Sequence, residues 1–257
     1  MNRTGLIVAL GLAVIVGVIF GLFPQLDLMI SAPFNAWVGK GVNFFAHIYP
    51  PFMLLRDIGL WVGAVIIIPV VAALLFKLLL PRRRLLMSGR AIVFLISTLA
   101  LGPGLLANVV LKDHWGRPRP IDVAQFGGNQ HFVAWWDPRG DCPGNCSFVS
   151  GDVSGAVWTI APAALVPPQW RALAYGAALT LAAGMAALRL AAGAHFFTDV
   201  FFAGVFTFLI IWVVHGLIFR WPRTRLTDEG VEHAIERFAL PGHDFLVGLL
   251  RKRKTEL

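Results

Sequence analysis

Apolar runs of about 20 residues constrain this chain more than any other feature of its sequence, because a helix needs roughly that length to cross a bilayer. Hydrophobic residues make up 57% of the 257 positions and charged residues only 14%. A soluble globular domain carries about one quarter charged residues, so this composition excludes that class. The sequence therefore predicts an all-α protein, a six-transmembrane helix bundle in a single membrane domain covering residues 1–257.

Prolines, glycines and charges mark the ends of the predicted spans. The first span follows Arg3 and has no small-residue cleavage site behind it, which favours a retained span over a signal peptide. The fourth is the weakest, because Asp152 opens it and Pro162 lies inside it. Pro103 and Gly104 are expected to kink the third. The six spans are roughly 5–23, 59–80, 91–111, 152–168, 170–188 and 196–219.

The distribution of basic residues predicts the orientation of the chain. With a cytoplasmic N-terminus and alternating spans, 15 of the 22 Lys and Arg residues fall on the cytoplasmic side and the other seven on the outer side. This bias follows the positive-inside rule, so both termini are predicted to be cytoplasmic in a bacterial inner membrane, with the outer loops in the periplasm. The seven outer residues are Lys40, Arg56, Lys112, Arg117, Arg119, Arg139 and Arg189.

Two segments are predicted to lie along the membrane surface. Residues 24–58 mix aromatic and polar residues, which indicates an outer interfacial segment or, equally, a cap packed over the bundle. Residues 220–257 are predicted to form a cytoplasmic tail whose interfacial helix is anchored by an Arg-Lys-Arg-Lys run. The aromatic residues of the first segment include Phe34, Trp37, Phe44, Phe45 and Phe52.

Charge and cysteine content exclude two other kinds of site. The net charge of +8 comes mostly from residues that flank apolar runs, so nucleic-acid binding is not expected. Cys142 and Cys146 have only His131 as a nearby further ligand, whereas a structural zinc site takes four. A disulfide or two free thiols are predicted instead, and a disulfide suits an outer, oxidising compartment. No metal or cofactor is expected.

Polar residues that could bind a ligand or take part in a reaction gather at the outer ends of the predicted spans. Charges at membrane depth are costly and usually have a task, and cations converging from separate helices suit an anion with several oxygens, such as phosphate. Ser150 and Gly151 open the fourth span with a hydroxyl and unpaired N–H groups, which bind an anion or simply cap the helix. The cations at the span ends are Lys112, Arg117, Arg119 and Arg189.

His195 and Asp199 lie four residues apart at the start of the sixth span, on one face of the predicted helix. A carboxylate beside an imidazole fixes its tautomer and stabilises its cation, as in nucleophile–orienter pairs. Such a pair is more often structural than catalytic. Arg189, six residues before His195, favours the catalytic interpretation.

Three blocks of residues carry a resemblance to a known family. Lys112-x6-Arg119-Pro120, Ser150-Gly151 and Arg189-x5-His195-x3-Asp199 resemble the three-part signature of the type 2 phosphatidic acid phosphatase superfamily. The resemblance covers a phosphatase core of residues 91–219. It implies that the cations of the signature bind phosphate with help from the Ser-Gly pair. It also implies that His195 attacks phosphorus to give a phosphohistidine, that Asp199 orients His195, and that water releases phosphate without a metal.

Three positions depart from the family pattern. Val149 and Leu188 replace a usual Pro and a usual Ser, and both changes look tolerable. Asp152 stands where the family has the histidine that protonates the leaving oxygen, so it is a candidate catalytic residue of changed chemistry. Three hypotheses follow. Asp152 is an acid or a water-activating base, or the leaving group needs little protonation, or the site binds lipid phosphates with little turnover. His114 and His131 are alternative acids, more simply loop residues.

The predicted function is an integral-membrane phosphatase that removes phosphate from a lipid phosphate or pyrophosphate at the outer face. Candidate substrates are lipid A, phosphatidylglycerol phosphate, phosphatidic acid and undecaprenyl pyrophosphate, with membrane lipids as the other expected partners. The alternatives are a lipid phosphotransferase and a low-turnover lipid-phosphate-binding protein. A transporter is disfavoured, because the spans are nearly free of charged residues.

Overall fold

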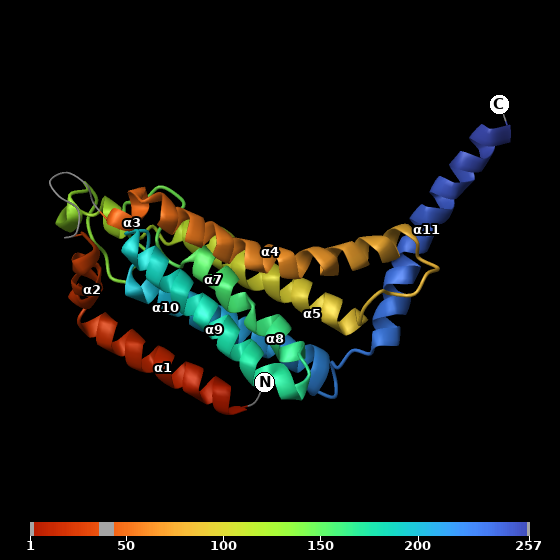
Figure 1. Ribbon diagram of the computed structural model, residues 1–257, viewed down its shortest axis with the longest axis horizontal. Helices are drawn as coiled ribbons and strands as arrows, with labels where there is room; N and C mark the ends of the chain where they lie inside the picture. Colours follow the sequence, from red (N-terminus) through yellow and green to blue (C-terminus); the bar gives the residue numbers. More distant parts are fainter. Residues whose placement is uncertain (1–2, 36–43, 256–257) are drawn as a thin grey trace. The chain divides into compact units, whose positions relative to one another are not determined.

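The computed structural model describes residues 3–35 and 44–255, most of which form helices (Figure 1). Five of the described helices are long and apolar enough to cross a membrane. The all-α membrane fold predicted from the apolar runs is therefore confirmed. These five helices are Arg3–Leu22 (α1), Pro50–Leu79 (α4), Gly89–His114, Pro168–Ala191 (α9) and Phe197–Arg220.

Two of the five are composites of consecutive helices. They are α5 (Gly89–Leu99), η1 (Ala100–Leu111) and α6 (Lys112–His114) in one case, and α10 (Phe197–His215) and η4 (Gly216–Arg220) in the other. The π-helix η1 contains Pro103, which has no N–H to donate to the preceding turn. The side-chain amide of Asn108 donates to the Pro103 carbonyl at 2.7 Å. A side chain thus satisfies a backbone group inside an apolar helix.

The predicted fourth span, 152–168, consists of two short helices, α7 (Gly151–Trp158) and α8 (Ile160–Leu165), so the count of six spans is not confirmed. The break falls at Thr159, whose hydroxyl donates to the carbonyl of Ala156 at 2.6 Å. A proline at position 162 adds to the break, because it supplies no N–H to the turn before it. Each helix alone is shorter than a bilayer requires.

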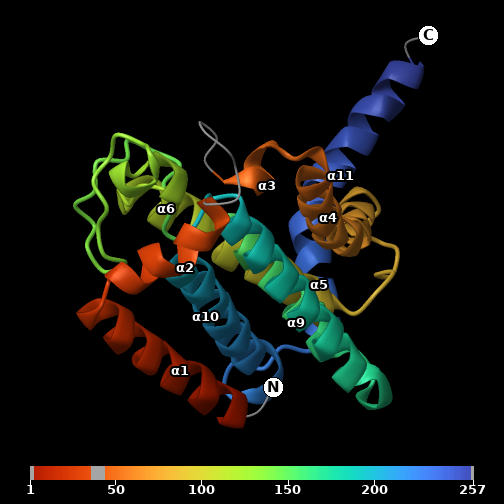
Figure 2. The same cartoon turned by 60° about the vertical axis from the view of Figure 1, so that its left-hand side comes forward.

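The chain divides into two compact units. Unit 1 comprises residues 1–63 and 98–213, and unit 2 comprises residues 64–97 and 214–257. Within unit 1, α9 packs against α7 and α8, and α7 packs against η1. The helix α2 (Gln25–Asn35) turns away from α1 and contacts α9 (Figure 2). Every predicted site residue belongs to unit 1.

The segment predicted to lie in the outer interface, 24–58, comprises α2, α3 (Phe45–Ile48) and the first turns of α4. The second span therefore begins earlier than predicted. Asp27 and Phe44 are both buried, and Phe44 packs among other buried hydrophobic side chains. These contacts fit the alternative interpretation of the segment as a cap packed on helix ends. Two of its residues, Trp37 and Lys40, lie outside the described part of the chain.

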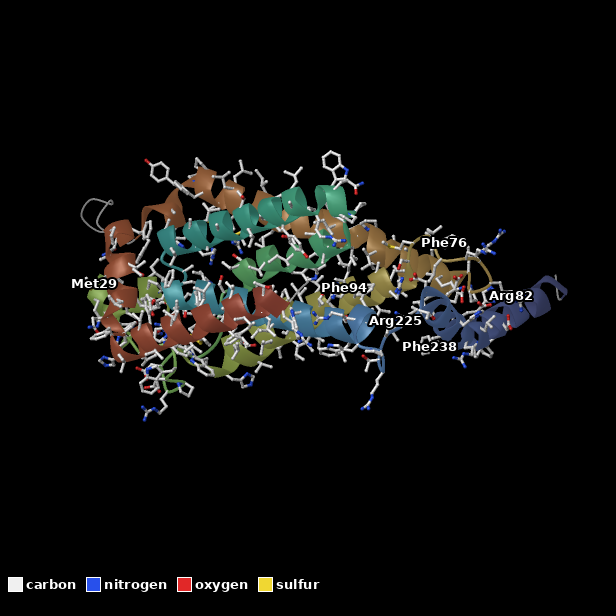
Figure 3. The ribbon with its side chains drawn as sticks, turned by 90° about the horizontal axis from the view of Figure 1, so that it is seen from below. Met29, Phe76, Arg82, Phe94, Arg225 and Phe238 are labelled. Carbon is white, nitrogen blue, oxygen red and sulfur yellow. A yellow bond between two sulfur atoms is a disulfide. The ribbon has the colours of Figure 1, made fainter. Side chains whose placement is uncertain are left out.

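Unit 2 contains most of the predicted tail as the helix α11 (Asp228–Thr255). Lys77 is 1% exposed, and its ammonium donates to Glu232 at 3.2 Å and to Glu236 at 3.4 Å. Phe94 packs edge-on against neighbouring rings of the same unit (Figure 3). The first half of α11 is thus held by a buried lysine and not only by surface charges.

Candidate active site

The loop between α6 and α7 ties the first two blocks of the signature together. The N–H of Cys146 donates to the carbonyl of Lys112 at 2.9 Å, and the N–H of Ser147 donates to the carbonyl of Arg117 at 2.8 Å. Cys142 and Cys146 are joined by a disulfide, with their Cα atoms 5.8 Å apart. The end of the loop is therefore fixed to its beginning by backbone hydrogen bonds, and a covalent link closes its last turn.

Arg117 lies at the centre of a buried polar network. Its guanidinium pairs with the carboxylate of Asp27 at 2.8 Å and with that of Asp199. It also donates to the hydroxyl of Thr198 at 2.7 Å. The three charged side chains are at most 1% exposed. Because a buried charge is stable only when it is paired and hydrogen-bonded, this network fixes α2, the loop and the start of α10 to one another.

Asp27 is a site-supporting residue that the sequence analysis missed. Its two oxygens accept from the N–H of Thr198 at 3.0 Å and from the hydroxyl of Thr198 at 2.6 Å, besides the pairing with Arg117. Arg117 was expected among the span-end cations that suit an anion, whereas the structure buries its guanidinium between Asp27 and Asp199. The one available signal was a charged residue between two apolar neighbours, Leu26 and Leu28, since such a residue needs a buried partner.

His195 lies in the turn between α9 and α10 and is 1% exposed. Its Nδ1 is 2.7 Å from the carbonyl oxygen of Ser147. A carbonyl oxygen only accepts, so Nδ1 carries the proton and Nε2 keeps its lone pair. This is the tautomer in which Nε2 can act as a nucleophile.

Asp199 contacts the residue that holds His195, not the imidazole itself. Its Oδ2 accepts from the Ser147 hydroxyl and from the N–H of Phe196 at 2.7 Å. The direct contact expected from the four-residue spacing is therefore replaced by an indirect one through Ser147. Asp199 accepts from the Ser147 hydroxyl, and the Ser147 carbonyl accepts from the His195 imidazole. The reason is local: His195 precedes the first residue of α10, Phe197, so helical spacing does not apply to it. Ser147 was not among the predicted site residues.

The predicted phosphate-binding cations act on His195. Burial lowers the pKa of His195 well below its usual 6.5, and the charges of Arg189, Arg119 and Lys112 lower it further, against the hydrogen bond to the Ser147 carbonyl. Lys112 and Arg119 belong to the first block of the signature and Arg189 to the third, so cations from two separate stretches of the chain act on the ring. The imidazole is therefore neutral at neutral pH, which is the form that attacks an electrophile.

Ser150 and Gly151 open α7 beside η1. The Ser150 hydroxyl accepts from the N–H of Val153 at 3.4 Å, which is the capping role considered from the sequence. A Cβ at position 151 would lie too close to the side-chain amide of Asn108, which would have to move, so glycine allows the present close approach. The phosphate contacts expected of both residues stay predictions.

Asp152 forms ion pairs with two arginines. Nε and a terminal nitrogen of Arg56 donate to its two oxygens at 2.7 and 3.4 Å, and Nε of Arg189 lies 3.3 Å from the same carboxylate. The Arg56, Asp152 and Arg189 side chains are 28%, 18% and 13% exposed. Arg119 instead donates to the carbonyl of Asn145 at 2.7 Å. Arg56 was not predicted as a site residue; the structure brings it to Asp152 across 96 positions of sequence.

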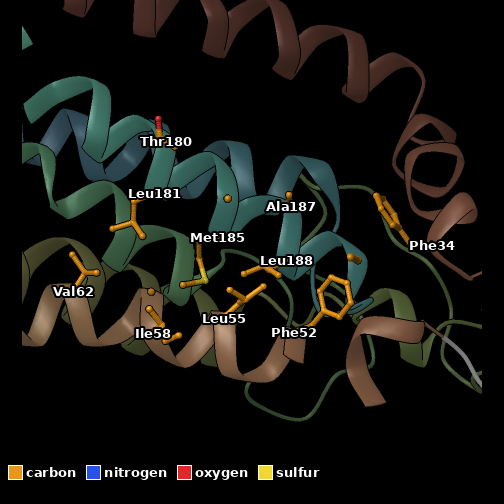
Figure 4. Close-up of a pocket in the computed structure, with 13 residues that line it drawn as sticks. Phe34, Phe52, Leu55, Ile58, Val62, Thr180, Leu181, Met185, Ala187 and Leu188 are labelled. Atoms are coloured by element: carbon orange, nitrogen blue, oxygen red, sulfur yellow. The ribbon is translucent and has the colours of Figure 1, made fainter. Parts of the chain in front are cut away.

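An apolar groove lies between α4 and α9 (Figure 4). Its volume is about 580 Å³. Leu55 and Leu188 line it, and they are the sequence neighbours of Arg56 and Arg189. The groove and the cation cluster are therefore adjacent. Other lining residues are Phe34, Phe52, Ile58, Val62, Leu181 and Met185.

Comparisons with known proteins agree with these motifs. The family model described as the PAP2 superfamily matches residues 91–223. A lipid A 4'-phosphatase of Francisella tularensis subsp. novicida (strain U112) is 34% identical over 232 residues, 86% of this chain and 98% of the relative. A lipid A 4'-phosphatase of Rhizobium leguminosarum is 47% identical over 108 residues, 41% of this chain and 45% of that protein. No solved structure gives a significant match. The resemblance seen in the three blocks of residues is confirmed, and the chain belongs to the PAP2 superfamily.

Proposed function

We propose that this chain is a membrane phosphatase that removes phosphate from lipid A through a phosphohistidine at His195. The observation that carries the proposal is the state of His195: a buried, neutral imidazole, held at Nδ1 by the Ser147 carbonyl, with three cations acting on it. At the coarser level, the family and its similar relatives support a bacterial membrane enzyme that hydrolyses the phosphate monoester of a lipid.

The proposed reaction has two steps at one phosphorus atom. Nε2 of His195 attacks phosphorus while the bond to the lipid oxygen breaks, and the lipid leaves as its alcohol after that oxygen takes a proton from water, which the hydrolysis step returns to the solvent. Water then attacks the phosphohistidine, which releases inorganic phosphate and restores the neutral imidazole. Lys112, Arg119 and Arg189 are proposed to stabilise the charge on the phosphoryl oxygens, which is where most of the rate enhancement in phosphoryl transfer arises.

Two observations support a lipid and, among lipids, lipid A. The groove between α4 and α9 is apolar and is lined by the sequence neighbours of Arg56 and Arg189, so a lipid chain can lie in it while the head group meets the cations. The two relatives described above both bear the name lipid A 4'-phosphatase, and one of them matches this chain over nearly its whole length. The removal of the 4'-phosphate is accordingly the specific reaction that we propose.

The proposed location of the site is the periplasmic face of the inner membrane. The excess of basic residues on the opposite side supports a cytoplasmic location for both termini. The disulfide between Cys142 and Cys146 lies in the same loop as the site and suits an oxidising compartment.

Phosphate release from a panel of lipids tests the proposal. Purified protein would be incubated with lipid A, phosphatidic acid, phosphatidylglycerol phosphate and undecaprenyl pyrophosphate. We expect the fastest release from lipid A and a loss of about a thousandfold or more in His195→Ala, since removal of a nucleophile abolishes the covalent route. His233→Ala, a change at an exposed histidine of α11, is the matched control and should act as wild type.

Labelled substrate separates the alternatives. A rapid alkaline quench should trap labelled phosphate on the wild-type protein and not on His195→Ala. Label that appears on a second lipid instead of free phosphate would indicate phosphotransfer. Full activity in His195→Ala would contradict the mechanism, and tight binding of every lipid without turnover would favour a binding protein.

A further inference from the structure

The ion pairs of Asp152 give it a role other than proton transfer. We infer that Asp152 is a positioning residue and that Arg56, which it holds, is a fourth phosphate-binding cation of the site. The inference rests on the proposed phosphatase function and extends it, because Arg56 belongs to none of the three blocks of the signature.

The geometry leaves both arginines able to take another ligand. Arg56 meets Asp152 through Nε at 2.7 Å and through one terminal nitrogen at 3.4 Å. Its other terminal nitrogen has only a 3.4 Å contact with Asp57, whose side chain is 54% exposed, and such a pair is weak in water. Nε of Arg189 lies 3.3 Å from the Asp152 carboxylate, and neither terminal nitrogen of Arg189 has a hydrogen-bond partner among the described residues. A phosphate can therefore bind both guanidinium groups while Asp152 still holds them.

The charges also favour this arrangement. Lys112, Arg119, Arg189 and Arg56 contribute four positive charges and Asp152 one negative charge, which leaves three in excess. A phosphate monoester carries a charge of about −1.5 to −2 at neutral pH, so it suits this excess. Without a carboxylate among them, the cations would repel one another before the substrate arrives.

The same pairing argues against Asp152 as the leaving-group acid. A general acid must carry a proton when the substrate binds. A carboxylate with a guanidinium on each side is stabilised in its ionised form, which cannot supply one. Asp152, which replaces the family's histidine, is therefore assigned to the positioning of Arg56 and not to proton donation. Arg56 lies on α4, whereas Asp152 lies on α7.

The position of Arg56 connects the phosphate site with the lipid groove. Leu55 and Arg56 are consecutive on α4, as Leu188 and Arg189 are on α9. One residue of each pair lines the groove and the other contacts Asp152. A phosphate attached to a lipid in the groove would therefore meet both arginines at once.

Substrates with different leaving groups test the role of Asp152. Asp152→Asn, Arg56→Gln and the double variant would be assayed with a lipid alkyl phosphate and with 4-nitrophenyl phosphate, whose leaving group needs no proton. We expect each single variant to lose about ten- to a hundredfold in kcat/KM on both substrates, as for a lost hydrogen bond to a charged group. The kcat/KM of the double variant should be only slightly lower than that of the less active single variant, since Asp152 acts partly through Arg56. Loss on the alkyl phosphate alone in Asp152→Asn would identify an acid and overturn the inference, and so would multiplicative effects.

Inhibition by inorganic phosphate tests Arg56 without the chemistry. Arg56→Gln should raise the inhibition constant about tenfold or more, and Arg56→Lys should recover part of the loss because it keeps the charge but not the two-pronged geometry. An unchanged inhibition constant in Arg56→Gln would show that Arg56 does not bind phosphate. Arg56→Lys also replaces Arg56→Gln if the latter unfolds at lower temperature than wild type.

A second arginine–aspartate pair provides the matched control. Arg139 and Asp137 pair at 2.8 Å on the loop between α6 and α7, but Arg139 is 78% exposed and lies outside the cation cluster. Arg139→Gln and Asp137→Asn should act as wild type in every assay, and a loss like that of Arg56→Gln would contradict the inference. Activity in His195→Ala would instead reject the phosphatase mechanism itself, so the two failures are distinguishable.

Discussion

The two sides of the candidate site are built in different ways. On the side of the proposed nucleophile, His195, Asp199, Arg117 and Asp27 are all at most 1% exposed. On the proposed phosphate side, the Arg56, Asp152 and Arg189 side chains are 13% to 28% exposed, so this side is only partly buried. Buried pairs are costly to separate, whereas pairs in contact with water exchange partners at little cost.

This difference matches two different tasks. A nucleophile is most effective when its geometry is set before the substrate arrives, because no reorganisation is then needed in the transition state. A phosphate-binding site must accept and release a charged ligand in each cycle. The fully buried network suits the first task, and the partly exposed ion pairs of Asp152 suit the second.

The largest expected effect comes from removal of the central cation of the buried network. Arg117→Met leaves Asp27 and Asp199 without their shared partner, and the loss of one member of a buried pair costs about 3–5 kcal/mol. Thermal or denaturant unfolding in detergent measures the loss. Arg139→Met removes an exposed arginine of the same loop and should change stability by less than about 0.5 kcal/mol. Equal stability of the two variants would show that the buried network does not hold the fold.

A smaller effect is expected from the indirect contact between Asp199 and His195 through Ser147. Ser147→Ala removes the hydroxyl that donates to Asp199 but keeps the carbonyl that accepts from His195. We expect kcat to fall about ten- to a hundredfold, from the loss of a hydrogen bond to a charged group, with little change in KM because the cations are untouched. Ser154→Ala, which breaks a buried hydroxyl pair with Thr207, is the control and should keep normal kcat. A change in KM alone would place Ser147 on the phosphate side instead.

The smallest expected effect is a pH dependence of the free energy of unfolding that arises from His195, on the buried side of the site. The pKa of His195 is lowered by its burial and by the neighbouring cations, so the folded protein keeps a neutral imidazole below pH 6.5. The unfolded chain takes up this proton near pH 6.5, so the free energy of unfolding should fall as the pH drops below that value and be unaffected above it. Imidazole NMR signals, assigned with His195→Gln, report the titration. A midpoint at or above 6.5 would contradict the buried, neutral state.

Several features of the site follow from short-range sequence patterns. The spacing Lys112-x6-Arg119 and the Arg189–His195 turn identify the family, and the family model and the similar relatives confirm it. The break at Thr159 could not be predicted with the same certainty, because an apolar run with prolines fits one kinked span as well as two short helices. The direct His195–Asp199 contact expected from helical spacing is not formed, because His195 lies two residues before α10 begins at Phe197.

The sequence by itself determined that this is an all-α membrane protein with a phosphate-binding signature, because apolar length and motif spacing are local properties that each segment carries alone. Only the tertiary structure decided which distant residues complete the site. Asp27 reaches Arg117 across 90 positions, and Arg56 reaches Asp152 across 96. The physical reason is that a buried charge requires a partner but does not specify which one, and only the packing of the helices decides which residues meet.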